Sequence, residues 1–118
     1  MANPDIVDLA TLNYERNGVA MTTATGTLVG EVATGEVEVI DCFFISNVDG
    51  TNDADATITH VQSGGSSIKI LSTVTIKADT TERIDGPINL TEGDYMTGSA
   101  SANGDLEFAA YKRKMSET

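Results

Sequence analysis

The sequence is poor in the residues on which most catalytic and metal sites depend. It has one histidine (His60), one cysteine (Cys42) and no tryptophan among its 118 residues. Zinc sites take several Cys or His ligands, which this chain does not have. No Ser-His-Asp set can be assigned around His60, and a single histidine in an alternating run is more often a packed or surface residue than a base. We therefore expect no catalytic residue, no metal ligand and no cofactor.

Basic residues and long apolar runs are scarce as well. Seven Lys and Arg residues stand against 18 Asp and Glu residues, which gives a net charge of −11. Non-specific binding to nucleic acids depends on basic side chains that neutralise phosphates, so we expect no nucleic-acid partner. No window approaches the roughly 20 consecutive apolar residues of a membrane span. The first 14 residues have neither a basic region nor an apolar segment, and we expect no secretory signal and no membrane partner.

What the sequence does contain is a long apolar stretch, Glu36 to Asn47, which we expect to be the central strand. Strict alternation puts two apolar sets on its two faces, Val37, Val39, Phe43 and Ile45 on one and Ile40, Cys42 and Phe44 on the other. A strand that is apolar on both faces is usually covered on both. One face would meet the domain's own core and the other a second layer or another subunit. Ile40, Cys42 and Phe44 are therefore candidate partner contacts, and Cys42, which has no disulfide partner, is expected to be a buried thiol.

Turn signals divide the remaining chain into short segments of extended character. A loop rich in Asp, Asn and Gly follows at 48–55, and Ala56–Val61 is the expected antiparallel partner of the central strand. Residues 68–76 suit two short strands or one bent strand, and Asn103-Gly104-Asp105 predicts a hairpin before a last strand at Leu106–Lys112. Seven to nine short strands with such spacing predict an all-β fold, an antiparallel β-sandwich of jelly-roll-like topology.

The length suits a single domain with one core. We expect residues 1–35 to form an N-terminal arm and the first strands, and residues 36–118 to form the body of the sandwich. Two interpretations compete for residues 5–14. Asn3 and Pro4 suit the start of a helix, whereas Ile6, Ala10, Leu12 and Tyr14 share one face of a strand or extended arm. We favour the strand or arm because the sequence downstream is β throughout.

Two charged clusters have both a binding and a structural interpretation. Asp49, Asn52, Asp53 and Asp55 offer oxygen ligands for Ca²⁺, but the position eleven after Asp49 is His60 rather than the Glu of a twelve-residue calcium loop, so a solvated loop is the simpler interpretation. Lys112, Arg113 and Lys114 gather three of the seven bases near the end of the chain. They are candidate contacts with an acidic partner, or they keep this end of the chain soluble.

Three motifs in order carry a resemblance to a known group of proteins. They are a strand that ends in Ile45-Ser46-Asn47-Val48-Asp49-Gly50, the run Ile88-Asn89-Leu90-Thr91-Glu92-Gly93-Asp94, and Ala100-Ser101-Ala102 followed by Leu106. From about Val37 to Tyr111 the chain resembles small virion structural proteins of tailed bacteriophages, especially those of marine and cyanobacterial phages. That group has no catalytic residues to carry over.

The resemblance implies a non-enzymatic β-sandwich that serves as an assembly module. We expect a capsid decoration (cement) protein that binds the capsid surface and stabilises the shell, located in the virion after synthesis in the host bacterial cytoplasm. The implied partners are copies of the same chain, for which a trimer is a common arrangement, and the major capsid protein or other virion proteins. A position at the neck, tail or fibre is the alternative. A carbohydrate-binding module that reads a host receptor is another, for which only Tyr14, Tyr95 and Tyr111 offer suitable rings.

Overall fold

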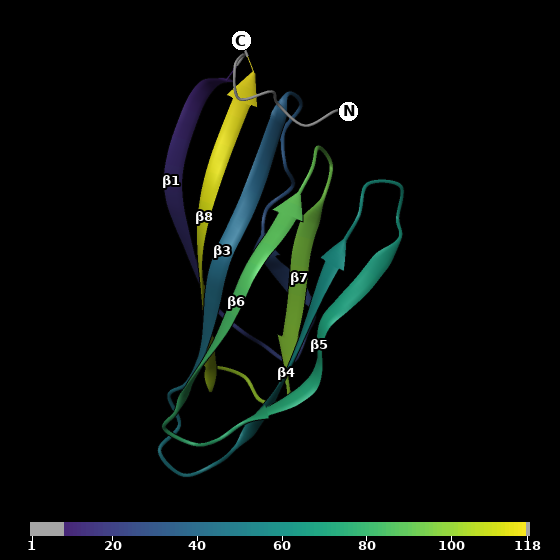
Figure 1. Cartoon of the computed structure of the whole chain (residues 1–118). Helices are drawn as coiled ribbons and strands as arrows, with labels where there is room; N and C mark the ends of the chain where they lie inside the picture. The colour runs from purple at the N-terminus through teal and green to yellow at the C-terminus, as the bar shows by residue number, and fades with distance from the viewer. Residues whose placement is uncertain (1–8, 118) are drawn as a thin grey trace.

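The computed structural model describes residues 9–117, and this part of the chain is built from strands and turns (Figure 1). None of its described segments is a helix long and apolar enough to cross a membrane. The eight strands are β1 (Leu9–Ala20), β2 (Gly26–Val29), β3 (Glu36–Asn47), β4 (Ala54–Val61), β5 (Ser67–Ile76), β6 (Thr81–Leu90), β7 (Tyr95–Ala100) and β8 (Leu106–Glu117).

The strands form two four-stranded antiparallel sheets that pack face to face. One sheet has the order β1-β8-β3-β6 and the other β2-β7-β4-β5. Consecutive strands therefore mostly alternate between the two sheets, and the first and last described strands, β1 and β8, pair with each other. The prediction that Ala56–Val61 is the antiparallel partner of the central strand is wrong, because β4 pairs with β5 and β7 in one sheet, whereas β3 pairs with β6 and β8 in the other. This order is that of an eight-stranded jelly roll. The predicted fold class, an all-β antiparallel sandwich of jelly-roll type, is confirmed.

The core lies between the sheets and is aliphatic with two central rings. Phe43 of β3 and Phe108 of β8 are buried with their ring centroids 5.4 Å apart. Around them pack buried aliphatic side chains from both sheets, among them Ile45, Ile58 and Met96. The expectation that β3 supplies the central packing therefore agrees with its position between β8 and β6.

A β-bulge in β3 changes which of its side chains face the core. Ile40 pairs with Lys112 of β8, but the next pair is Cys42 with Tyr111, so Asp41 is an extra residue. One extra residue reverses the alternation of side chains beyond it. Ile40 therefore shares the inner face with Phe43 and is fully buried in the core cluster. The prediction that Ile40 lies on the same face as Cys42 and Phe44 is wrong for this reason. By the same register Val37 and Val39 do not share a face with Phe43 and Ile45 as predicted, although both are buried.

The first strands expected within residues 1–35 are β1 and β2, and each is hydrogen-bonded into a sheet. β1 pairs with β8 in continuous register from Thr11 to Ala20. For residues 9–14 the strand interpretation is therefore correct and the helix interpretation is wrong. Residues 5–8, and the rest of the expected arm at residues 1–4, lie outside the described part of the chain.

The inner face of the β1-β8-β3-β6 sheet turns from apolar to charged towards one end. In β8, Phe108 and Ala110 are followed on the same face by Lys112 and Lys114. Figure 1 shows β1, β8 and β3 rising past the turn that joins β6 to β7. Lys112 donates to Glu38 at 2.7 Å, and only 7% and 5% of these two side chains are exposed. A buried ion pair thus takes the place of an apolar pair at this end of the sheet.

Candidate binding face

The side of the β1-β8-β3-β6 sheet that points away from the core gathers aromatic and arginine side chains. We call this side the outer face. By register it carries Leu12, Tyr14 and Arg16 of β1, Tyr111 and Arg113 of β8, Cys42 and Phe44 of β3, and Arg83 and Asp85 of β6. The exposed fractions of Leu12, Tyr14 and Tyr111 are 45%, 75% and 44%. Exposed apolar side chains of this size, clustered on one sheet, mark a candidate interaction surface.

A line of rings crosses three of the four strands on this face. Tyr14 and Tyr111 are diagonal neighbours, because Tyr14 pairs with Arg113 and Tyr111 pairs with Arg16. Tyr111 meets Phe44 edge-to-face, with ring centroids 5.7 Å apart at 90°. The guanidinium of Arg83 lies 5.7 Å from the centroid of Phe44. These contacts hold the rings of Tyr111 and Phe44 in place, so the exposed Tyr14 lies next to two ordered aromatic rings.

All three arginines of the chain lie on the outer face. Arg113 donates from Nε and Nη2 to Asp41, with a shortest distance of 2.9 Å. Arg83 donates to Asp85 at 2.7 Å. Arg16 is exposed and makes no ion pair within residues 9–117. A protein with net charge −11 thus presents three guanidinium groups on one sheet. Those of Arg83 and Arg113 are ion-paired, and that of Arg16 has no ion pair within residues 9–117.

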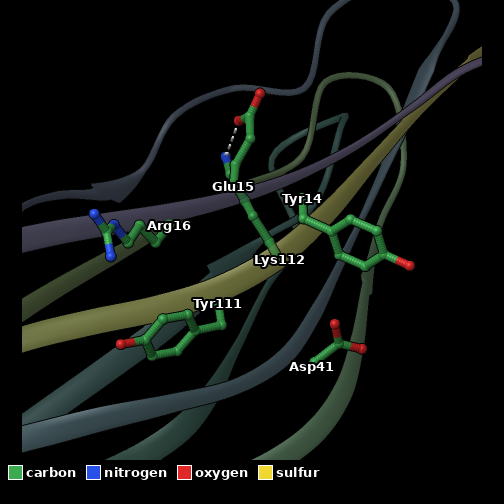
Figure 2. Close-up of a pocket in the computed structure, with 6 residues that line it drawn as sticks. All are labelled: Tyr14, Glu15, Arg16, Asp41, Tyr111 and Lys112. Atoms are coloured by element: carbon green, nitrogen blue, oxygen red, sulfur yellow. Dashed lines mark ion pairs between the residues drawn. The ribbon is translucent and has the colours of Figure 1, made fainter.

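A shallow pocket opens around the two tyrosines (Figure 2). Its volume is about 370 Å³, and Tyr14, Arg16, Asp41 and Tyr111 line it together with Glu15 and Lys112. Figure 2 shows Tyr14, Tyr111 and Asp41 on one side of the sheet, with Glu15 and Lys112 extending to the other side, where their charged atoms are 3.8 Å apart. The formal charges of the four ionisable carboxyl, guanidinium and ammonium groups that line the pocket sum to zero.

The three predicted partner contacts in β3 have different positions. Phe44 and Cys42 lie on the outer face and are partly exposed, as a partner contact requires. Ile40 is covered completely by the core of its own chain and has no surface to offer. Cys42 is a free thiol, as expected, but it is only partly buried, so the prediction of a buried thiol is wrong.

The basic cluster 112–114 is not a free tail. These residues belong to β8, and each pairs with an acidic residue of β3: Lys112 with Glu38, Arg113 with Asp41 and Lys114 with Glu36, the last at 3.4 Å. Burial alone would lower the pKa of the Lys114 ammonium, but the adjacent Glu36 carboxylate raises it above the usual value. Of the three, Arg113 lies on the outer face, whereas Lys112 and Lys114 lie on the inner face. The cluster therefore stabilises its own sheet before it offers charge to a partner.

The acidic loop does not bring its oxygens together. Asp49 accepts hydrogen bonds from the backbone N–H groups of Thr51 and Asn52, and these bonds lower the pKa of its carboxyl. Asp53 accepts from the N–H of Ala78, which lowers its pKa as well, and Asp55 accepts from the hydroxyl of Thr75. Among residues 9–117 no group of three or more His, Cys, Asp or Glu side chains is placed to hold a metal ion. The loop has the geometry of a turn held by its own side chains.

His60 takes part in a structural contact at the turn between β6 and β7. Its Nε2 lies 3.1 Å from Oδ2 of Asp94, and both side chains are largely buried. Burial alone would raise the pKa of Asp94, but the N–H of Ser63, His60 and the N–H of Thr91 donate to its carboxylate and lower that pKa below the usual value. This arrangement fixes the turn onto β4.

The proximity of Tyr14 and Tyr111 on the outer face is the feature that the sequence analysis missed. The two rings are separated by almost the whole chain, and only the register between β1 and β8 brings them together. The third tyrosine, Tyr95, lies in β7 of the other sheet, opposite Val61. The available signal was the occurrence of Tyr and Arg at alternate positions in both terminal segments, Tyr14 with Arg16 and Tyr111 with Arg113.

Comparison with known proteins supports the fold. No protein-family model and no curated protein matches the sequence. Among solved structures, the chain is similar to a protein from the structure titled "Bacillus endospore appendages form a novel family of disulfide-linked pili", with a TM-score of 0.51 and 11% identity over 100% of this chain and 94% of that one. It is also similar to VP2 of the infectious bursal disease virus subviral particle, with a TM-score of 0.52 and 8% identity over 91% of this chain and 33% of that one. The chain thus spans about a third of the viral protein, and at such identities the likeness shows a shared β-sandwich fold.

Proposed function

We propose that this protein is a non-enzymatic structural protein of a tailed-phage virion and that it serves as a capsid decoration protein. In this role it binds the capsid surface through the outer face and stabilises the shell. The resemblance of residues 37–111 to small virion proteins supports this role, and the jelly-roll fold is compatible with it.

The composition of the outer face is the observation that carries the proposal. Protein interfaces are enriched in Tyr, Phe and Arg, and these residues dominate the binding energy. The outer face holds all three arginines, two of the three tyrosines and one of the three phenylalanines of the chain. An open sheet surface with these side chains suits contact with another protein.

A binding assay with matched variants tests the proposal. Purified protein is mixed with tailed-phage capsids assembled without it, and the bound fraction is measured by co-sedimentation. We expect saturable binding, weakened by about tenfold or more in Tyr111→Ser, because truncation of a central aromatic anchor costs at least about 1.4 kcal/mol. Ile68→Ser is the control, because Ile68 is exposed on the other sheet. Absence of binding, or equal losses in both variants, would contradict the proposal.

The pocket between Tyr14 and Tyr111 supports a second candidate, a carbohydrate-binding module that reads a host receptor. Aromatic rings stack on the apolar faces of sugars, and the adjacent Asp41 and Arg16 can bond their hydroxyl groups. On a glycan array we expect this function to appear as binding that Tyr14→Ser abolishes and Tyr95→Ser leaves intact. An array without signal would exclude it and leave the decoration role, with imaging of whole particles to decide between shell, neck and tail.

A further inference from the structure

The two sheets of the sandwich end in four edge strands, β1 and β6 in one sheet and β2 and β5 in the other. An edge strand presents unpaired backbone N–H and C=O groups that can pair with another chain. Proteins usually prevent such pairing with short strands, bulges, prolines or lysines at the edge. The four edges of this protein differ in these protective features.

Three of the edges are interrupted. β2 is four residues long and its register shifts between Thr27 and Val29. β5 has two register shifts against β4, and Thr73 within it has a φ of 52°, a conformation that breaks a regular strand. β6 contains Pro87, which has no N–H to donate, next to the site where its register with β3 shifts. None of these three offers a long, regular template.

β1 lacks these interruptions over most of its length. It is twelve residues long, its register against β8 is unbroken from Thr11 to Ala20, and it contains neither proline nor lysine. No other described strand pairs with its second edge, and Figure 1 shows it at the margin of its sheet. Side chains on both of its faces are exposed from Leu12 to Arg16. Within residues 9–117 this edge is therefore unpaired and regular.

We propose that β1 pairs with β1 of a second copy of the chain, antiparallel across a twofold axis, so that two four-stranded sheets join into one of eight strands. A twofold axis perpendicular to the sheet keeps inner side chains opposite inner ones. Two registers then give the longest overlap, one centred on Tyr14 and one centred on Glu15. The second places two Glu15 carboxylates directly opposite each other, which is unfavourable.

The register centred on Tyr14 places no two like charges directly opposite each other. It places Tyr14 opposite Tyr14 of the second copy, Asn13 opposite Glu15, and Leu12 opposite Arg16. Arg16, which has no ion pair within the described residues, then lies diagonal to a tyrosine ring of the other copy. The two outer faces also become one surface, with the aromatic rows of both copies meeting at the axis. A second copy is thus an occupant that the chemistry of this edge fits.

The inference stands on strand geometry and charge, and it does not require that the protein bind a capsid. Its test is made on the full chain without any capsid, so its failure and that of the decoration role can be told apart. Sedimentation velocity from about 1 µM to 1 mM measures the mass of the free protein, over the range of weak to moderate affinities. We expect a monomer–dimer equilibrium that Tyr14→Lys weakens by about tenfold or more, because it removes the contact between the two Tyr14 rings and also places like charges opposite each other. Ile68→Lys, which adds the same charge on the other sheet, leaves the equilibrium largely unchanged.

Cross-linking tests the register. Residues directly opposite each other in an antiparallel pair have Cα atoms about 4.5–5.5 Å apart, which is within the range of a disulfide. In a Cys42→Ser background, Tyr14→Cys is therefore expected to form a covalent dimer on mild oxidation, whereas Gly18→Cys, four residues from the axis, does not. A protein that stays monomeric at 1 mM, or cross-linking that is equal in the two variants, would overturn the proposal.

Discussion

Removal of one partner of the buried Lys112–Glu38 ion pair gives the sharpest prediction about stability. In Lys112→Met the side chain keeps its approximate length and loses its charge. The Glu38 carboxylate, of which 5% is exposed, then loses the ammonium that lies 2.7 Å away. A buried charge left without its partner costs about 3–5 kcal/mol, a large share of the total stability of a small domain. Lys114, the nearest remaining base on the same face of β8, is paired with Glu36 and interacts less strongly with Glu38 than with Glu36.

Urea unfolding, followed by circular dichroism, measures this cost. With an m-value of about 1.5–2 kcal/mol per molar, a loss of this size moves the unfolding midpoint down by about 2 M. Lys77→Met is the matched control. Its partner Asp53 and Lys77 itself are exposed, and loss of that pair costs at most about 1 kcal/mol.

The double variant Glu38→Leu/Lys112→Met completes the test. Replacement of a buried ion pair by apolar side chains of similar volume is often neutral or stabilising, so we expect the double variant to recover most of the loss. If Lys112→Met costs no more than Lys77→Met, then the pair is not buried in solution. If the double variant is less stable than either single variant, then the charged inner face is not a substitute for apolar packing.

Three further predictions concern the core and the turns. Phe43→Ala should lower the free energy of unfolding by about 3–5 kcal/mol because Phe43 is fully buried. Phe44→Ala, on the outer face, should cost distinctly less, and equal losses would contradict the assignment of these two side chains to opposite faces of β3. Burial alone would raise the pKa of Asp94, but the hydrogen bonds that its carboxylate accepts lower that pKa below the usual value. The ionised carboxylate therefore stabilises the fold at pH values above the pKa it has in the unfolded chain. This stabilisation is lost as the pH falls through the pKa of the folded protein. Asp94→Asn should cost about 1–2 kcal/mol at pH 7 and less near pH 3, and a loss independent of pH would contradict this. Gly98→Ala should cost about 1–3 kcal/mol, because a Cβ there would lie 2.5 Å from Leu28 Cδ1, and an unchanged unfolding midpoint would show that Leu28 moves aside freely.

The sequence predicted the fold class because its strand and turn signals are local. Gly64-Gly65 and Asn103-Gly104 mark turns by the conformations they allow, and all three glycines have the positive φ that such turns use. The turn at Asn103-Gly104 joins strands of different sheets, so the prediction of a hairpin there is wrong although the turn itself is present. The alternative of one bent strand at residues 68–76 is also correct, and the bends are the two register shifts of β5. β6 was harder to predict because an edge strand with Pro87 and alternating polar residues resembles a loop.

The details of the outer face could not be predicted for two physical reasons. A bulge depends on how a strand meets its neighbours, and nothing in the composition of Glu36–Asn47 singles out Asp41 as the extra residue. A single such residue moved Ile40 from the candidate surface into the core. The platform of Tyr14 and Tyr111 depends on pairing between the two terminal strands, which is a long-range contact that local patterns do not encode.

Cryo-electron microscopy of tailed-phage capsids incubated with the purified protein tests most directly whether this jelly roll is a decoration protein. We expect additional density of this size at regular positions on the outside of the shell, with the β1-β8-β3-β6 sheet turned towards the capsid and Tyr111 at the contact. Capsids without added density, density confined to the neck or tail, or attachment through the β2-β7-β4-β5 sheet would contradict that role.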